Sequence, residues 1–262
     1  MWPQGKRFAV CLTFDFDAEE AWLADDPASA GRPVDLSQGA YGARVGVPAI
    51  LDLLERRGVQ ATFFVPGRVA QTHGDRVREI VAAGHELAGH GFTHREPASL
   101  TEEEEREELA LAREALEIFG VEVVGYRAPG WACSPRTIGL VAELGFRYSS
   151  SFMDDVRPYV HEGTEVVELP VHWTLDDAPH FWFDGATWTK TIRSAAEVRA
   201  LWEEEVLGIR DLGGLAVLTC HPQVIGRPGR LRMLDGFVGW LLGMDDVYLS
   251  TCVGIADLRP WT

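Results

Sequence analysis

Short hydrophobic runs alternate with amphipathic segments along most of the 262 residues. Hydrophobic runs bounded by glycine, proline and polar residues favour buried strands, and segments with helical spacing between capping signals favour helices. The expected strands cover residues 8–14, 59–65, 85–88, 121–126, 146–149, 166–171, 215–220 and 247–250, and the expected helices cover 48–57, 75–83, 101–120, 135–144, 194–207 and 231–242. This alternation predicts a parallel sheet, either closed as a barrel or open and doubly wound.

Polar residues with catalytic potential directly follow strands that are far apart in the chain. They are Asp15, Asp17, His90, His94, Arg127 and His221. In a barrel, the C-terminal ends of parallel strands converge on one face, where active sites lie. The placement of these residues therefore favours a barrel, and the chain length suits one domain spanning residues 1–262.

Two other segments carry acidic residues. Residues 18–47 are acidic and rich in glycine and proline, which indicates a lid or a binding loop, with disorder as the alternative. Residues 102–108 follow a capping box formed by Thr101 and Glu104, so their charges lie where the helix dipole favours them. We expect this second run to be a solvated helix face.

The spacing of His90 and His94 indicates a metal site. Histidines four apart in one strand would stand roughly 13 Å apart, but Gly91 interrupts the strand and a tight turn can bring the imidazoles together. A carboxylate from another strand end, Asp17, would complete a set of three protein ligands. This set suits zinc, and also iron, cobalt, nickel or manganese.

The remaining polar residues suit hydrolysis. An ion of this kind lowers the pKa of bound water to about 7, and Asp15 could take its proton as general base. His221 could protonate the departing nitrogen as general acid. Arg127 would orient Asp15, and a backbone N–H in the turn after Arg127 could stabilise an oxyanion. The alternatives are a structural ion pair for Arg127 and simple packing for His221.

Composition narrows the classes of partner. Hydrophobic residues make up 46% of the chain, enough for a large core, and the formal net charge of -16 argues against nucleic acid or an anionic membrane as a partner. The first seven residues lack the apolar segment of an export signal, and no apolar run is long enough to cross a bilayer. We therefore expect a cytoplasmic protein that binds a small-molecule substrate. Its four cysteines are expected to be buried thiols.

Four motifs, TFDFD, GHGFTH, YRAPGW and LTCHP, occur in this order, and the chain resembles the polysaccharide deacetylase family in all four. The resemblance implies an α/β fold, a distorted (β/α) barrel of about seven parallel strands. It also implies a site with Asp15 as catalytic base, Arg127 as the arginine that tunes it and His221 as general acid. The metal ligands would be Asp17, His90 and His94.

The sequence departs from the family pattern in three places. Phe16 separates the two aspartates, as in an intracellular branch similar to allantoinases and cyclic imide hydrolases, and this branch implies a homo-oligomer. Gly130 replaces the usual aromatic residue of the arginine motif, which makes the backbone that would serve the oxyanion more flexible. The carboxylate that supports the general acid has no clear match, and Asp154 or Asp155 is the candidate.

The sequence thus predicts a metal-dependent hydrolase of a linear or cyclic amide or imide in a small intracellular molecule. Trp131 and Trp173 are candidate walls of the substrate pocket. One alternative is an N-deacetylase of an acetylated amino sugar or polysaccharide. Another is a barrel that binds an ion or ligand without catalysis.

Overall fold

The hydrophobic run that begins at Phe8 forms β1 (Phe8–Asp15), the strand around which the sheet is built. The structure is a computed structural model that describes residues 2–183, 188, 191–258 and 261. All residues of β1 are buried, as expected when both faces of a parallel sheet are covered. β1 pairs in parallel with β2 (Thr62–Val65) and β9 (Val247–Leu249) on one side and with β8 (Leu215–Cys220) on the other.

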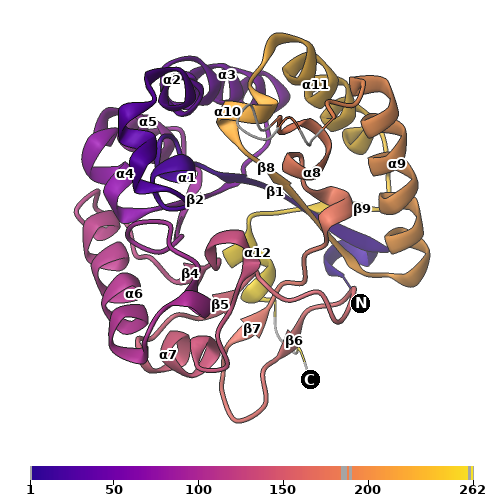
Figure 1. The fold of residues 1–262 in the computed structure, drawn as a ribbon. Coiled ribbons are helices and arrows are strands. Elements are labelled where there is room, and N and C mark those ends of the chain that lie inside the picture. The colour runs from indigo at the N-terminus through magenta and orange to yellow at the C-terminus, as the bar shows by residue number, and fades with distance from the viewer. Residues whose placement is uncertain (1, 184–187, 189–190, 259–260, 262) are drawn as a thin grey trace.

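The sheet curls into a barrel, which confirms the predicted fold (Figure 1). Its other strands are β3 (Glu86–Gly89), β4 (Gly125–Tyr126), β5 (Tyr148–Ser149), β6 (Tyr159–Val160) and β7 (Val167–Glu168). The order across the sheet is β6-β7-β5-β4-β3-β2-β1-β8. Neighbouring strands are parallel except β6, which lies antiparallel to β7 at the edge and was not predicted from the sequence. Several strands are also shorter than predicted, because β4, β5 and β7 form ladders of only two residues.

The barrel is joined only loosely between its two edges. Among the described residues, the contacts at this seam include a bridge between Asp176 and Thr219, hydrogen bonds from the Asp177 N–H to the Thr219 carbonyl and from the Leu215 N–H to the Val156 carbonyl, and two hydrogen bonds from His221 to Asp177. We refer to this region as the β7–β8 seam. The closure is therefore distorted, as the family resemblance implied.

Helices surround the sheet (Figure 1). They are α1 (Glu20–Leu23), α2 (Pro33–Tyr41), α3 (Val47–Arg57), α4 (Gly67–Thr72), α5 (Gly74–Ala82), α6 (Glu102–Glu117), α7 (Thr137–Glu143), α8 (Ala178–Phe181), α9 (Ala195–Leu212), α10 (Pro222–Ile225), α11 (Pro228–Leu242) and α12 (Cys252–Ala256). The predicted capping boxes are both present, at Thr101 of α6 and Ser194 of α9. These signals located helix starts well because each satisfies otherwise unpaired N–H groups.

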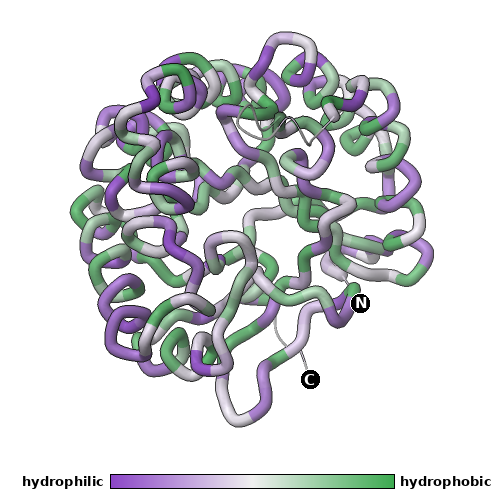
Figure 2. Tube along the Cα trace, viewed as in Figure 1, coloured by the Kyte–Doolittle hydropathy of each residue, from purple (hydrophilic) through white to green (hydrophobic). Residues whose placement is uncertain are grey.

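Two hydrophobic clusters fill the molecule. The larger lies between the sheet and the surrounding helices, where Trp202 of α9 packs edge-on against Phe237 of α11. The smaller includes Ala9, Cys11 and Phe64. Hydrophobic and hydrophilic positions alternate along the outer helices, as expected for helices that bury one face against the sheet (Figure 2). Cys11, Cys220 and Cys252 are buried free thiols as predicted, and Cys133 is a partly buried one.

The segment 18–47 is helical, which corrects the prediction of a loop. It contains α1, α2, a 3-10 helix (Pro27–Gly31) and a π-helical turn (Gly42–Gly46) that runs into α3. Gly39 lets α2 pack against the backbone after β1, because a Cβ atom there would lie 2.5 Å from the Ala18 carbonyl oxygen. We call residues 18–47 the helical insert. The helices in the described residues include none that is long and apolar enough to cross a membrane.

Candidate active site

The alternation of β1 places both aspartates of the TFDFD motif at the same cavity. Phe14 and Phe16 are buried in the larger hydrophobic cluster. Asp15 ends the strand on the opposite face and Asp17 follows two residues later, and both carboxylates line the cavity while remaining buried. Two acidic groups therefore share this end of the barrel, as the spacing predicts.

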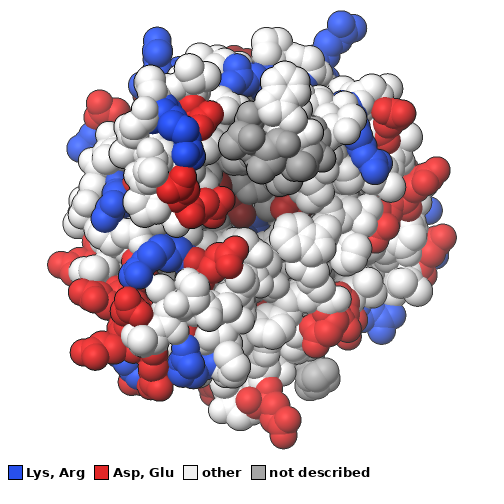
Figure 3. Space-filling model, in the orientation of Figure 1, with Lys and Arg blue, Asp and Glu red and all other residues white. Residues whose placement is uncertain are grey.

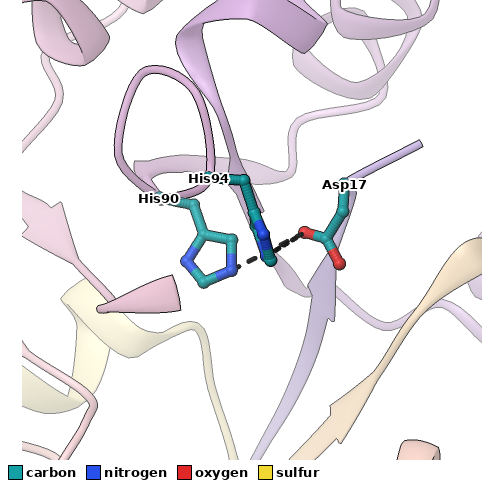
Figure 4. Close-up of side chains that lie close together, drawn as sticks. All are labelled: Asp17, His90 and His94. Carbon is teal, nitrogen blue, oxygen red and sulfur yellow. Dashed lines mark ion pairs between the residues drawn. The ribbon is translucent and has the colours of Figure 1, made fainter. Parts of the chain in front are cut away.

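Asp17, His90 and His94 come together at the strand ends (Figure 4). The Asp17 Oδ1 atom lies 3.6 Å from His90 Nε2 and 3.6 Å from His94 Nε2. Two atoms that each lie about 2.1 Å from a tetrahedral ion are roughly 3.4 Å apart. The spacing in the structure therefore suits one shared ion.

The two imidazoles are neutral, which is the state that binds a metal. Burial lowers the pKa of His90 to about 4, and burial is also the main cause that lowers the pKa of His94 well below its usual range. The His90 Nδ1–H donates a hydrogen bond to the Arg127 carbonyl at 2.8 Å. This bond fixes the tautomer and leaves Nε2 free as a ligand.

One buried atom supports an ion at this position. The Oδ1 atom of Asp17 has no hydrogen-bond partner among the described residues, although the side chain is only 1% exposed. Burial and the nearby charge of Asp15 raise the pKa of Asp17 well above its usual range, against the opposing effect of His221. A cation would satisfy Oδ1 and favour the charged carboxylate, so the donor set fits a divalent metal.

Asp15 is held from behind by Arg127. The Arg127 Nη1 donates to Asp15 Oδ1 at 2.6 Å and to the Thr13 hydroxyl at 2.9 Å. The other side of the guanidinium donates to the carbonyl and hydroxyl of Ser150, and its plane lies over Phe64. Arg127 is fully buried and does not line the cavity, so its contact with the site is through Asp15.

His221 lies at the end of β8, on the other side of the cavity from the two ligand histidines. Its Nε2 is 3.8 Å from Asp17 Oδ2, and its Nδ1 is 2.6 Å from Asp177 Oδ1. Burial opposes the charged ring, but the carboxylates of Asp177, Asp176 and Asp17 raise the pKa of His221 well above its usual range. The ring is therefore protonated at neutral pH. Its Nδ1 is bound to Asp177, which leaves the Nε2–H for the cavity that His221 lines.

The carboxylate that supports His221 is Asp177, not Asp154 or Asp155. Asp177 accepts hydrogen bonds from both the ring and the backbone N–H of His221. Asp154 instead accepts one from the Tyr159 hydroxyl, and Asp155 caps the N–H groups of the residues that follow it. The sequence offered a signal in the pair Asp176-Asp177, but their place beside β8 depends on the β7–β8 seam, which no local pattern predicts.

These groups surround a cavity of about 450 Å³, visible as a hollow in the surface (Figure 3). Trp131 and Trp173 form one wall, with ring centroids 4.4 Å apart, so both predicted aromatic residues line it. Trp22 of the helical insert and Trp182 stack 4.7 Å apart and also line it. Gly130, the remaining residue predicted to bind substrate, adopts φ +60° beside the cavity.

The acidic run 102–108 is only partly a solvated face. Glu105 and Glu108 are buried, at 1% and 7% exposure, which corrects the sequence interpretation for these two residues. Glu105 accepts hydrogen bonds from Ser134 and Thr137. Glu108 accepts hydrogen bonds from backbone N–H groups of the loop that carries His94. Glu108 was not predicted from the sequence, because no local pattern predicts a contact between a helix side chain and the backbone of another segment.

The fold and site define a barrel that gathers buried carboxylates and histidines, among them a group that could hold a metal ion, at its strand ends. A family model described as polysaccharide deacetylase matches residues 35–149, which include His90, His94 and Arg127. A solved structure from Mycobacterium smegmatis, described as a candidate polysaccharide deacetylase, is 43% identical with a TM-score of 0.96, over 100% of this chain and 95% of that one. The chain belongs to the polysaccharide deacetylase family, whose members are hydrolases of carbon–nitrogen bonds other than peptide bonds.

Two further relatives differ in the activity that their names give. A peptidoglycan deacetylase of Helicobacter pylori is 29% identical over 96% of each chain. The solved structure of Puue allantoinase is 24% identical, with a TM-score of 0.86 over 100% of this chain and 94% of that one, which shows a shared fold. The deacetylases of this family are metal-dependent, in agreement with the donor set described above.

Proposed function

We propose that this protein hydrolyses a linear or cyclic amide or imide of a small molecule, using a divalent metal. The observation that supports this most is that two pairs of residues and one group of three meet at one cavity. Asp15 is paired with Arg127, His221 is paired with Asp177, and Asp17 lies with the two ligand histidines. A site that only binds a ligand has no need for both a base and an acid.

Each residue then has a defined part in the reaction. Asp17, His90 and His94 would hold the ion, which supplies Lewis acidity that lowers the pKa of a water. Asp15, oriented by Arg127, takes a proton from the attacking water. His221 donates its proton to the departing nitrogen, which is a poor leaving group until it is protonated. The charge of Asp177 stabilises the protonated form of His221 before that transfer.

The turn after Arg127 is the proposed site for the developing oxyanion. The N–H groups of Trp131 and Ala132 donate to carbonyls within this turn. The N–H of Gly130 is therefore our candidate donor. A side chain at position 130 would strain the backbone and bring a Cβ atom to 3.0 Å from Glu96 Oε1, which favours glycine at this position.

Zinc is the metal that we propose, because two imidazoles and one carboxylate suit it. Iron, cobalt, nickel and manganese accept the same ligands. Elemental analysis of protein purified without added metal tests the choice. A stoichiometric content of one of the other four metals would replace zinc, and protein active with none would contradict the metal-dependent mechanism.

The dimensions of the cavity favour a small substrate. A volume of about 450 Å³ is in the range for small-molecule sites, and two pairs of tryptophans border it. Such faces suit a planar ring. Asp25, Asp26 and Glu96 also line the cavity together with Arg32, which pairs with Asp26, so the acidic groups outnumber the arginine and disfavour an anionic substrate.

The second candidate is an N-deacetylase of an acetylated amino sugar or polysaccharide. It is favoured by the relation to a peptidoglycan deacetylase along nearly the whole chain. The test compares purified protein on chitooligosaccharides, succinimide, dihydrouracil and allantoin under one set of conditions. We expect turnover of at least one of the three cyclic compounds, and turnover of the sugar alone would overturn the preferred function.

Substitution of the proton-transfer residues tests catalysis itself. Asp15→Asn and His221→Ala should each reduce turnover of the best substrate by about 10²–10⁴-fold. Both variants should retain bound metal, because neither residue belongs to the ligand set. If neither substitution changes any detectable activity, the alternative of a non-catalytic binding barrel is correct.

A further inference from the structure

The loop between the two ligand histidines has a strained backbone. Gly91 has φ +69° and His94 has φ +60°, so both are in the left-handed conformation. Glycine adopts this conformation readily, but a residue with a Cβ atom does so at a cost that the surrounding structure must offset. The position of the His94 ring therefore depends on what holds residues 91–94.

The N–H groups of Gly67 and Arg68 in α4 donate to the Gly91 and Phe92 carbonyls of this loop at 3.0 and 2.9 Å, and one buried carboxylate binds the loop from the other direction by accepting from its N–H groups. Glu108 projects from α6, and its Oε2 accepts hydrogen bonds from the backbone N–H groups of Phe92 at 2.8 Å and Thr93 at 2.7 Å. Its Oε1 accepts one from the Thr93 hydroxyl at 2.5 Å, and Arg95 donates to the same atom at 3.4 Å. Both oxygens are thus engaged by the loop and its neighbour Arg95.

We infer that Glu108 is a positioning residue that sets the metal affinity of the site without binding the ion. It fixes the loop so that His94 Nε2 stays within reach of Asp17 Oδ1, 3.6 Å away. The carboxylate of Glu108 is not among the ligand atoms that cluster at the site. This inference rests on the proposed metal site and adds to it a residue on a separate helix.

The chemistry of a carboxylate is required for this role. A glutamine at position 108 keeps the size of the side chain but has one acceptor oxygen in place of two. That oxygen can serve the two N–H groups and the amide can donate to the Thr93 hydroxyl oxygen, but the negative charge that strengthens these hydrogen bonds and attracts Arg95 is lost. Glu108→Gln therefore loosens the loop while leaving the packing of α6 nearly unchanged.

The same helix provides a matched control. Glu105 is also buried and accepts two side-chain hydrogen bonds, but from Ser134 and Thr137, in a segment that carries no metal ligand. Glu105→Gln removes a comparable buried charge. A general loosening of α6 would affect both variants equally, whereas a specific effect on the loop would appear in Glu108→Gln alone.

The experiment is a titration of metal-free protein with Co²⁺, followed by visible absorption. We expect the Kd of Glu108→Gln to be about 10–100-fold weaker than that of the parent, with a changed absorption spectrum, because partners behind the ligands typically have effects of this size. Glu105→Gln should match the parent in both respects. An unchanged Kd and spectrum in folded Glu108→Gln, or equal weakening in both variants, would overturn the inference.

A second variant tests the inference in case Glu108→Gln does not fold. Thr93→Val removes the hydroxyl that donates to Glu108 Oε1 and keeps the shape of the side chain. It should weaken Co²⁺ binding several-fold, and an unchanged Kd would also count against the inference. If the parent protein itself binds no Co²⁺, the proposed metal site is wrong, which is distinct from a parent that binds and variants that bind equally well.

Discussion

The charge on His221 is the property of a single residue on which the proposed chemistry depends most. A general acid must carry its proton at the working pH, and an unperturbed imidazole, with a pKa near 6.5, would be mostly deprotonated at neutral pH. Burial of the ring lowers its pKa further. The nearby carboxylates, above all Asp177, outweigh burial and raise the pKa of His221 well above its usual range. The pH above which activity falls should therefore depend on the charge of Asp177.

Asp177→Asn should reduce kcat/KM by about 10²–10⁴-fold and shift its pH profile. Removing the negative charge lowers the pKa of His221, so the acid loses its proton at a lower pH as the pH rises. The alkaline limb of the profile should move to lower pH, and the profile measured on both proteins checks this. Asp154→Asn is the control, because Asp154 contacts Tyr159, and a similar shift in that variant would contradict the assignment.

Arg127 is the residue whose loss should affect stability most. Arg127→Met leaves Asp15 buried without its cationic partner, and breaking a buried pair in this way costs about 3–5 kcal/mol. Urea unfolding should show a loss of this size. The double variant with Asp15→Asn should recover part of it, because the uncompensated charge is then gone. No recovery would show that the cost arises from the lost contacts to Ser150 and Thr13 instead.

At the scale of elements, the helical insert forms part of the cavity. It begins directly after Asp17, and its Trp22 lines the cavity. Its helix α2 packs against the backbone of Ala18, the residue that follows Asp17. A shift of α2 would therefore be transmitted to the metal ligand at the end of β1.

Gly39→Ala should destabilise the protein by about 1–3 kcal/mol and lower kcat/KM. Alanine normally stabilises a helix by roughly 1 kcal/mol relative to glycine, but the new methyl group would lie 2.5 Å from a backbone oxygen, so α2 must move. Unfolding and steady-state kinetics measure both effects. Gly31→Ala in the same insert meets no atom within 4 Å and should change neither, and equal effects in both variants would contradict the packing argument.

Local signals explain which elements could be predicted from the sequence. The capping boxes at Thr101 and Ser194 and the buried runs of β1 and β8 are complete within a few residues, so they located their elements well. The helical insert carries only shorter signals, the cap at Asp26 and the prolines that begin the 3-10 helix and α2, and it also packs on Ala18 and α10. In the site, motif residues follow their own strands, whereas Asp177 and Glu108 reach it through tertiary contacts.

At the scale of the whole molecule, the bound ion would link β1 to the loop after β3. Asp17 Oδ1 is buried and has no hydrogen-bond partner within the described part of the chain, and a ligand at 1,000 times its Kd stabilises the folded state by about 4 kcal/mol. Adding Zn²⁺ to protein stripped by a chelator should raise the melting temperature by on the order of 10 °C, as measured by calorimetry. Asp17→Asn should show little of this increase, and a full increase would place the ion elsewhere.

Several properties of the whole protein remain predictions. They are the single-domain organisation, the assembly as a homo-oligomer, the small-molecule partner and the cytoplasmic location. Sedimentation of the purified protein would measure its assembly, and microscopy of tagged protein in its host would measure its location.

The two sides of the site differ in how firmly the sheet holds them against unfolding, because one of them depends on the β7–β8 seam. Asp17, His90 and His94 are anchored on the continuously paired side of the barrel, whereas the Asp177 that supports His221 reaches β8 across the seam, through one backbone hydrogen bond to Thr219 and two hydrogen bonds from His221. Mild heating or low urea should therefore disable proton donation before it releases the ion. An enzyme damaged in this way would keep its full metal content and yet be inactive, so metal analysis alone would misjudge a stored preparation.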